Sequence, residues 1–323
     1  MSSKRRRDHA PGAGPPRGSP GDIAVPDTVG PVAEDGWPRI GPLDGPGLVA
    51  AVNAATGAGL AYAGRLSGGN AGAVAAGRPD GTRVVLTRWD GWQLDRWPAL
   101  APLLERVRAA GYPIPALQVV PLPAGGAATV QERVDGAPAH RPTAGLVTDL
   151  LRLVELQAGV AARPASGLAD LHLSADGPGF CLHGPLREHS AATREVLAWV
   201  EEVGRSAPAD ALHGADLVHL DLHMGNVLVH RDDPDRVAGV VDWAGAAVGD
   251  RAFDLVTLGF DLSWHGEPET PVLDRLAAAD PGRLRAYAAH MSLRLVDWLL
   301  RHGGEQDVRR WVAVAHRWRA LTG

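Results

Sequence analysis

The sequence has a single cysteine, Cys181, among its 323 residues. One thiol cannot form an intramolecular disulfide, which excludes a small secreted fold held together by disulfide bridges. No apolar stretch approaches the roughly 20 residues that are needed to cross a bilayer, and the polar start lacks the apolar segment of a secretory signal. We therefore expect a cytoplasmic protein without a membrane partner, and we interpret Cys181 as a structural thiol.

The sequence also lacks a strong excess of either charge. Its formal net charge is -5, and basic and acidic residues are interspersed along most of the chain, so that no basic stripe predicts nucleic-acid binding. Residues 1–44 differ from the rest because they are rich in Pro and Gly and show almost no apolar periodicity. Such a segment cannot bury enough apolar surface to offset its ordering entropy, and we expect it to form a disordered tail.

The strongest chemical signal is a group of polar residues between two apolar runs. His219, Asp221 and Asn226 have the His-x-Asp-x-x-x-x-Asn spacing of a kinase catalytic loop, in which the Asp orients and deprotonates the attacking hydroxyl. Asp242 closes the next apolar run, so that a hairpin would bring Asn226 and Asp242 together beneath a metal ion. Such residues are also common in turns, where they cap backbone groups, but the joint spacing favours phosphoryl transfer.

The segment from His219 to Asn226, followed by Gly239-Val-Val-Asp-Trp243 and Gly249-Asp-Arg-Ala-Phe-Asp-Leu255, resembles the motifs of the aminoglycoside phosphotransferase and choline kinase-like family of small-molecule kinases. The resemblance implies an α+β, bilobal protein kinase-like fold, with a small lobe built on an antiparallel sheet and a larger, mainly helical lobe. Leu220 and Met224 depart from the pattern, because the family often has Gly and Pro at these two positions.

The resemblance also implies the roles of the motif residues. Asp221 would be the catalytic base, Asn226 and Asp242 would bind Mg²⁺, and Asp254 would brace the catalytic loop through hydrogen bonds. ATP, or alternatively GTP, would be the phosphate donor, and a hydroxyl group of a small molecule would be the acceptor. The interval between Asp242 and Asp254 is too short for a long regulated segment, so we expect constitutive activity.

Residues 45–136 are expected to form the nucleotide-binding lobe. Three strands, over 60–66, 73–76 and 83–89, would form a meander whose first hairpin is rich in glycine. Glycines there would let backbone N–H groups approach phosphate oxygens, although Gly-Gly-Asn is also an ordinary hairpin turn. The residues expected at the nucleotide in this hairpin are Ser67, Gly68 and Gly69.

The third strand has no lysine where a small-molecule kinase would carry one to hold the α and β phosphates. Thr87 and Arg88 point to opposite sides of this strand, and we expect Arg88 to face the nucleotide as the replacement cation. Arginine is not equivalent to lysine at such a site. Glu105 and Asp95, on a helix expected over 94–110, are both candidates for the acid that pairs with this cation.

The segment that follows the sheet resembles the hinge of the family. If so, backbone groups of Glu132 and Val134 would bind adenine. Residues 137–323 are expected to form the helical lobe with the catalytic loop and the acceptor site, with helices over 143–161, 186–204 and 283–321.

Two other functions are open at this point. On a strand, His219, Asp221 and His223 would point to one side and could hold the zinc of a metal hydrolase. Alternatively, the missing lysine fits a non-catalytic pseudokinase that binds nucleotide. The acceptor is also open, because the late part of the chain lacks the clear excess of acidic residues that would suit a polycationic aminoglycoside. The sequence does not indicate an oligomeric state.

Overall fold

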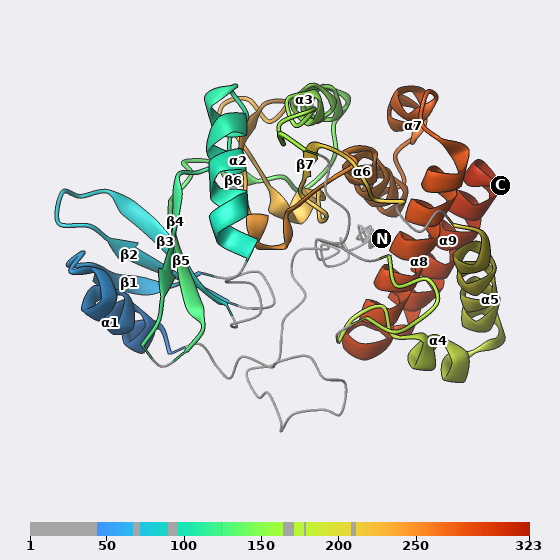
Figure 1. Cartoon of the computed structure of the whole chain (residues 1–323), viewed down its shortest axis with the longest axis horizontal. Helices are drawn as coiled ribbons and strands as arrows, with labels where there is room; N and C mark the ends of the chain where they lie inside the picture. The colour runs from blue at the N-terminus through green and yellow to red at the C-terminus, as the bar shows by residue number, and fades with distance from the viewer. Residues whose placement is uncertain are drawn as a thin grey trace, which may run out of the picture.

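The computed structural model describes residues 44–66, 72–89, 96–123, 125–163, 171–177, 179–207 and 211–323. The described chain has the predicted α+β architecture, with a small lobe built on an antiparallel sheet and a larger, mainly helical lobe (Figure 1). The glycine-rich hairpin with Ser67, Gly68 and Gly69, and the expected tail up to residue 43, lie outside the described residues.

The small lobe is a five-stranded sheet that carries one helix on its outer face (Figure 1). The sheet order is β1-β2-β3-β5-β4, and all neighbours are antiparallel. Its elements are α1 (Gly45–Thr56), β1 (Ala61–Leu66), β2 (Ala73–Gly77), β3 (Arg83–Trp89), β4 (Leu117–Pro121) and β5 (Ala127–Glu132). The side chain of Asp44 caps α1, and Leu48, Val49 and Val52 pack against the sheet in a separate apolar core.

The next helix, α2 (Trp97–Ala109), lies between the sheet and the helical lobe (Figure 1). Its buried residues Trp97, Leu100 and Leu104 belong to the core of the large lobe. Leu117 and Val119 of β4 also pack against that core. One face of the small sheet is therefore covered by α1, and the other is directed at α2 and the large lobe.

The large lobe is built mainly from helices. They are α3 (Ala144–Glu155), α4 (His183–His189), α5 (Ala191–Ser206), α6 (Ala252–His265), α7 (Thr270–Leu276), α8 (Pro281–His302) and α9 (Glu305–Thr322). The helix predicted over 186–204 is two helices. Ser190 separates them because its side chain accepts from the backbone N–H of Thr193, while the Thr193 hydroxyl accepts from the N–H of Ser190, a reciprocal cap that starts α5.

Two small sheets hold the loops between these helices. β6 (Ala137–Pro138), β8 (Val227–Val229) and β9 (Val237–Val240) form one sheet, and β7 (Asp216–Val218) pairs with β10 (Ala247–Gly249) in the other. Short 3-10 turns cover Met224–Asn226 and Trp243–Gly245. The predicted hairpin after Asn226 is present as β8 and β9.

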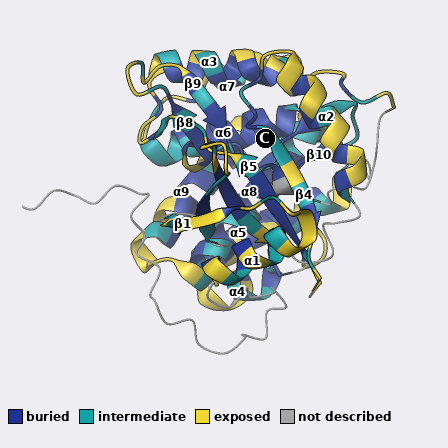
Figure 2. Cartoon of the chain, turned by 90° about the vertical axis from the view of Figure 1, so that its left-hand side faces the viewer, coloured by how far each residue is buried: buried dark blue, intermediate teal, exposed yellow. Residues whose placement is uncertain are grey.

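The interior of the large lobe is formed mainly by α6 and α8, which are largely buried, whereas α1 and α3 expose much of their outer surface (Figure 2). Residues Ala252 to Phe260 of α6 are buried without interruption. A helix enclosed in this way gives a rigid base for the loops packed on it. No helix in the described ranges is both long and apolar enough to span a bilayer.

Candidate active site

The loop between β7 and β8 is fixed by His219, which is fully buried. The His219 Nε2 atom donates to the carbonyl of Val241 at 2.9 Å, and Nδ1 accepts from the N–H of Asp221 at 3.3 Å. Burial lowers the pKa of His219, which keeps the imidazole neutral, as this pair of hydrogen bonds requires. With both nitrogens engaged, and the residues in a loop rather than a strand, His219 does not fit the zinc ligand of the hydrolase hypothesis.

Helix α6 holds this loop through two carboxylates. Asp254, which has no exposed surface, accepts from the backbone N–H groups of His219 and Leu220, each at 2.8 Å, and from the side-chain amide of Gln157 at 2.9 Å. Two turns later, Asp261 accepts from the N–H of Met224 at 2.9 Å. The brace expected at Asp254 is present, and Asp261 extends it to the far end of the loop.

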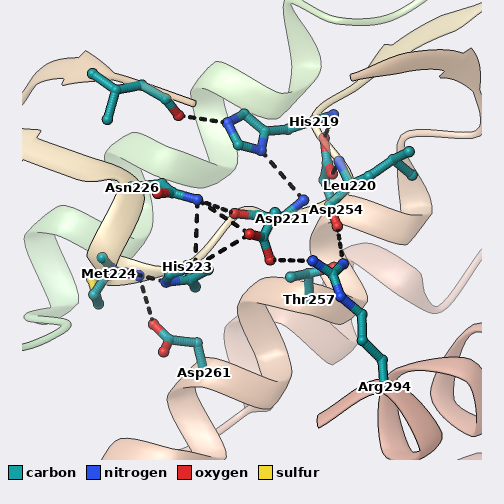
Figure 3. A network of polar contacts seen from close by, with 12 residues as sticks. His219, Leu220, Asp221, His223, Met224, Asn226, Asp254, Thr257, Asp261 and Arg294 are labelled. Atoms are coloured by element: carbon teal, nitrogen blue, oxygen red, sulfur yellow. Dashed lines mark hydrogen bonds and ion pairs between the residues drawn. The ribbon is translucent and has the colours of Figure 1, made fainter. Parts of the chain in front are cut away.

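Asp221 lies at the centre of this network, and its side chain is 35% exposed (Figure 3). Its Oδ1 atom accepts from Arg294 Nη2 at 2.9 Å, and its Oδ2 atom lies 3.5 Å from both His223 Nε2 and Asn226 Nδ2. Burial would raise the pKa of Asp221, but Arg294 and His223 outweigh it and hold the pKa well below its usual range. Asp221 is therefore an ionised, oriented carboxylate with access to solvent.

Asn226 and Asp242 are brought together by the β8–β9 hairpin. Val227 pairs with Val240, and the N–H of Val241 donates to the carbonyl of Asn226 at 2.9 Å. The Asn226 amide nitrogen donates to the carbonyl of Asp221 at 2.9 Å. The amide oxygen of Asn226 therefore points away from this carbonyl. Asp242 has a φ of 66°, a left-handed conformation that Asp tolerates better than most residues.

The surroundings of Asp242 fit a bound cation. Although Asp242 is exposed, desolvation of its carboxyl by the surrounding protein and the negative charge of Asp221 raise the pKa of Asp242 to about 6. A divalent cation between this carboxylate and the amide oxygen of Asn226 would supply the missing positive charge. Two oxygen ligands, completed by water and phosphate oxygens, are typical of Mg²⁺. No group of three or more His, Cys, Asp or Glu side chains suited to a metal occurs among the described residues.

The small lobe differs from the expectation at β3. The register of the sheet places Arg88 on the same face as Val84 and Leu86, which belong to the α1 core, and Arg88 is exposed. Thr87 occupies the face directed at the large lobe, where its hydroxyl bonds to Thr129. Arg88 therefore does not point toward the expected nucleotide site. Side chains alternate along β3, and this alternation directs Arg88 to the side of the sheet that α1 covers.

The candidate acids on α2 do not supply a partner for such a cation. Glu105 forms an exposed ion pair with Arg108 on the same helix, with 2.6 Å between Glu105 Oε2 and Arg108 Nη2. Asp95 lies outside the described residues. The only lysine in the sequence is Lys4, so every charged nitrogen that the described chain could offer to a phosphate belongs to Arg or His.

The hinge segment packs closely on the catalytic hairpin. The N–H of Glu132 donates to the carbonyl of Ala116 at 2.9 Å, which leaves the carbonyl of Glu132 as its available backbone group. The methyl groups of Val134 lie against Gly239 of β9, where an added Cβ would come within 2.8 Å of one of them. This contact ties the hinge to the strand that leads into Asp242.

Arg294 and Asp261 are site residues that the sequence reasoning did not find. Asp261 could have been found, because it lies seven residues after Asp254 and hence on the same face of a helix. Arg294 is 73 residues from Asp221, and no local pattern marks it.

Comparisons with known proteins identify the family and the fold of the chain. The model of the phosphotransferase enzyme family (APH) matches residues 65–290. A thermostable mutant of aminoglycoside phosphotransferase APH(4)-Ia, in ternary complex with ADP and hygromycin B, is similar with a TM-score of 0.59 and 19% identity over 81% of this chain and 94% of that chain. Amicoumacin kinase hAmiN, in complex with AMP-PNP, Ca²⁺ and Ami, has a TM-score of 0.52 and 12% identity over 81% of this chain and 88% of that chain.

At these identities the solved structures show a shared kinase-like fold. Among curated proteins, no sequence matches this chain significantly. The family model covers well over half of the sequence and includes the whole catalytic loop, both carboxylates of α6 and the β8–β9 hairpin. The chain therefore belongs to the phosphotransferase enzyme family.

Proposed function

We propose that the protein transfers the γ-phosphoryl group of ATP to a hydroxyl group of a small molecule. The observation that carries this proposal is the arrangement of Asp221, an ionised and solvent-accessible carboxylate, beside Asn226 and Asp242, whose side-chain oxygens could bind a metal ion. Phosphoryl transfer needs alignment and charge compensation more than covalent chemistry, and these residues provide both. The use of ATP also fits the cytoplasmic location expected from the sequence.

Each residue has one task in this mechanism. Asp221 accepts a hydrogen bond from the acceptor hydroxyl, directs its oxygen at the γ-phosphorus, and takes its proton as the new oxygen–phosphorus bond forms. Asp254 and Asp261 keep the loop rigid during this step. Asn226 and Asp242 would hold Mg²⁺, which would compensate the negative charge of the phosphates when bound.

The nucleotide would lie beside the hinge, with its phosphates directed toward Asn226 and Asp242. The carbonyl of Glu132 suits the amino group of adenine, and the N–H of Val134 suits a ring nitrogen, because two groups in alternate positions of an extended segment point to the same side. The glycine-rich hairpin, with Ser67, Gly68 and Gly69, remains our proposal for the phosphate cover. GTP offers a carbonyl where ATP offers the amino group, so this hinge favours ATP.

A pseudokinase is the second candidate, because the inward face of β3 carries Thr87 and no lysine. The two candidates make opposite predictions for turnover. A pseudokinase would bind nucleotide and leave it intact, whereas an active enzyme would hydrolyse ATP slowly with water as acceptor and would lose this activity in Asp221→Asn.

Calorimetric titration of AMP-PNP, with and without Mg²⁺, tests the nucleotide site. Asp242→Asn is the suitable variant, because Asn keeps the tolerance for positive φ and removes only the charge. We expect binding to wild type to depend on Mg²⁺ and this dependence to be lost in the variant. Exposed Asp232 provides a control, Asp232→Asn, that should bind like wild type. Equal Mg²⁺-dependent binding in all three proteins would refute the assignment of Asp242.

A further inference from the structure

Arg294 of α8 lies on the side of Asp221 that is opposite to Asn226 (Figure 3). It donates through Nη2 to Asp221 Oδ1 at 2.9 Å and through Nη1 to the carbonyl of Leu220 at 2.6 Å, whereas Asn226 approaches the other carboxylate oxygen, Oδ2. One oxygen of the base is thus directed at the proposed nucleotide and metal side, and the other at a guanidinium. Because the nucleotide is assigned to the Asn226 side, Arg294 lies on the side of the acceptor.

The guanidinium of Arg294 has donors left for a ligand. It has five N–H groups, and within the described chain two of them form the hydrogen bonds to Asp221 and Leu220. The side chain is 27% exposed, so that a ligand can reach part of it. Its backbone is held by Leu293 and Val296, which are fully buried. Arg294 therefore presents a fixed positive charge beside the catalytic base.

The acids on the same two helices are already paired. Helices α6 and α8 contain three carboxylates, and Asp254 accepts three hydrogen bonds from the loop and Gln157. Asp261 accepts from Met224 and lies 3.6 Å from His265. Asp297 is fully buried and bound through both oxygens by Arg301, each at 2.9 Å. On these helices, each of the three carboxylates already has a hydrogen-bonding or charged partner.

We infer that the acceptor is a hydroxy acid, whose carboxylate is recognised by Arg294 next to the hydroxyl that is phosphorylated. A guanidinium binds a carboxylate with two parallel hydrogen bonds, which would align the neighbouring hydroxyl with Asp221. The hydroxyl oxygen then bonds to the γ-phosphorus of ATP, the bond from this phosphorus to the β–γ bridging oxygen breaks, ADP leaves, and the hydroxyl proton passes to Asp221. This inference rests on the proposed function and adds the class of acceptor to it.

The same charge acts against polycations. An ammonium group brought to Asp221 would lie within a few ångströms of the guanidinium, and like charges at that distance repel each other strongly in a partly buried site. The single carboxylate of a hydroxy acid would instead be attracted by the guanidinium, and this attraction would have to outweigh its repulsion by the carboxylate of Asp221. Arg294 is therefore a specificity-determining residue of the acceptor side.

Ligand-observed NMR titrations of the Mg²⁺·AMP-PNP complex test this inference with three probes. D-Glycerate is a small hydroxy acid, glycerol is its neutral counterpart, and hygromycin B is a polyamine. The variants are Arg294→Gln, Arg294→Lys and, as a control on the same helix, Arg285→Gln, whose residue pairs with Glu202. We expect wild type to bind glycerate more tightly than glycerol or hygromycin B. We also expect Arg294→Gln to weaken glycerate binding about tenfold or more, with partial recovery in Arg294→Lys.

A purely structural role of Arg294 would weaken all three probes alike or leave them unchanged, so the ratio of glycerate to glycerol affinity separates the two roles. Equal affinity of wild type and Arg294→Gln for glycerate would overturn the inference, and so would tighter binding of hygromycin B than of glycerate to wild type, or no glycerate binding at all. Failure of wild type to bind Mg²⁺·AMP-PNP would instead refute the proposed function.

Discussion

Asp254 offers the sharpest test of how the catalytic loop is held. In Asp254→Ala, two backbone N–H groups and the amide of Gln157 lose their acceptor at a position without solvent access. An unsatisfied buried donor costs about 1–3 kcal/mol, so three of them, with partial relaxation, predict a loss of about 3–6 kcal/mol in the free energy of unfolding. This would be a large fraction of the roughly 5–15 kcal/mol of a typical domain.

The variant Asp254→Asn refines the prediction. Its single carbonyl oxygen can serve either Leu220, or His219 and Gln157, and its NH₂ group must then face a donor. We expect an intermediate loss of about 2–3 kcal/mol. Urea unfolding, followed by the fluorescence of the ten tryptophans, measures both losses against Asp232→Asn, which should stay within about 0.5 kcal/mol of wild type. If Asp254→Ala were as stable as this control, the loop would be held by other contacts and the reasoning would be refuted.

Three further predictions concern the backbone, the hinge and pH. Leu220 has a φ of 68°, so Leu220→Val should be less stable than Leu220→Gly by about 1–2 kcal/mol in urea unfolding, and the reverse order would contradict the strain. Gly239→Ala should weaken AMP-PNP binding measured by calorimetry, because the new Cβ meets the methyl groups of Val134; adding Val134→Ala should restore the binding, and no recovery would exclude this contact as the cause. Burial lowers the pKa of His290 to about 3, so His290 takes up a proton only on unfolding as the pH falls below its ordinary value near 6.5. The free energy of unfolding should fall by about 1.4 kcal/mol from this group between pH 7.5 and 5.5, and His290→Gln should remove this part of the slope; an unchanged slope would refute it.

The catalytic loop could be predicted from the sequence because its chemistry is local. His219, Asp221 and Asn226 lie within eight residues, and the hairpin that brings Asp242 back is marked by two apolar runs around a polar turn. Most strands and helices were found for the same reason, since each has its own periodicity. The split at Ser190 had a local signal as well, the Ser-x-x-Thr cap.

The orientation of side chains on β3 and the contacts between residues far apart in the sequence could not be predicted from local patterns. In β3, Val84, Val85 and Leu86 are all buried, because both faces of the strand are covered. The sequence pattern therefore does not show which residues of β3 face which side of the sheet. We expected Arg88 on the side where the structure has Thr87. The contact of Arg294 with Asp221 depends on the packing of α8 on the rest of the lobe, which local pattern does not encode.

The pairing of β7 with β10 has a consequence for control of the protein. β7 leads into the catalytic loop, and β10 begins five residues after Asp242, so three residue pairs, from Ala247–Val218 to Gly249–Asp216, join the two segments. The segment between Asp242 and Asp254 is thereby paired with the strand that leads into the catalytic loop, which fits the constitutive activity that we predict from its short length. Under this prediction, the amount of the protein would set its activity, and phosphorylation of the protein itself would leave the rate unchanged.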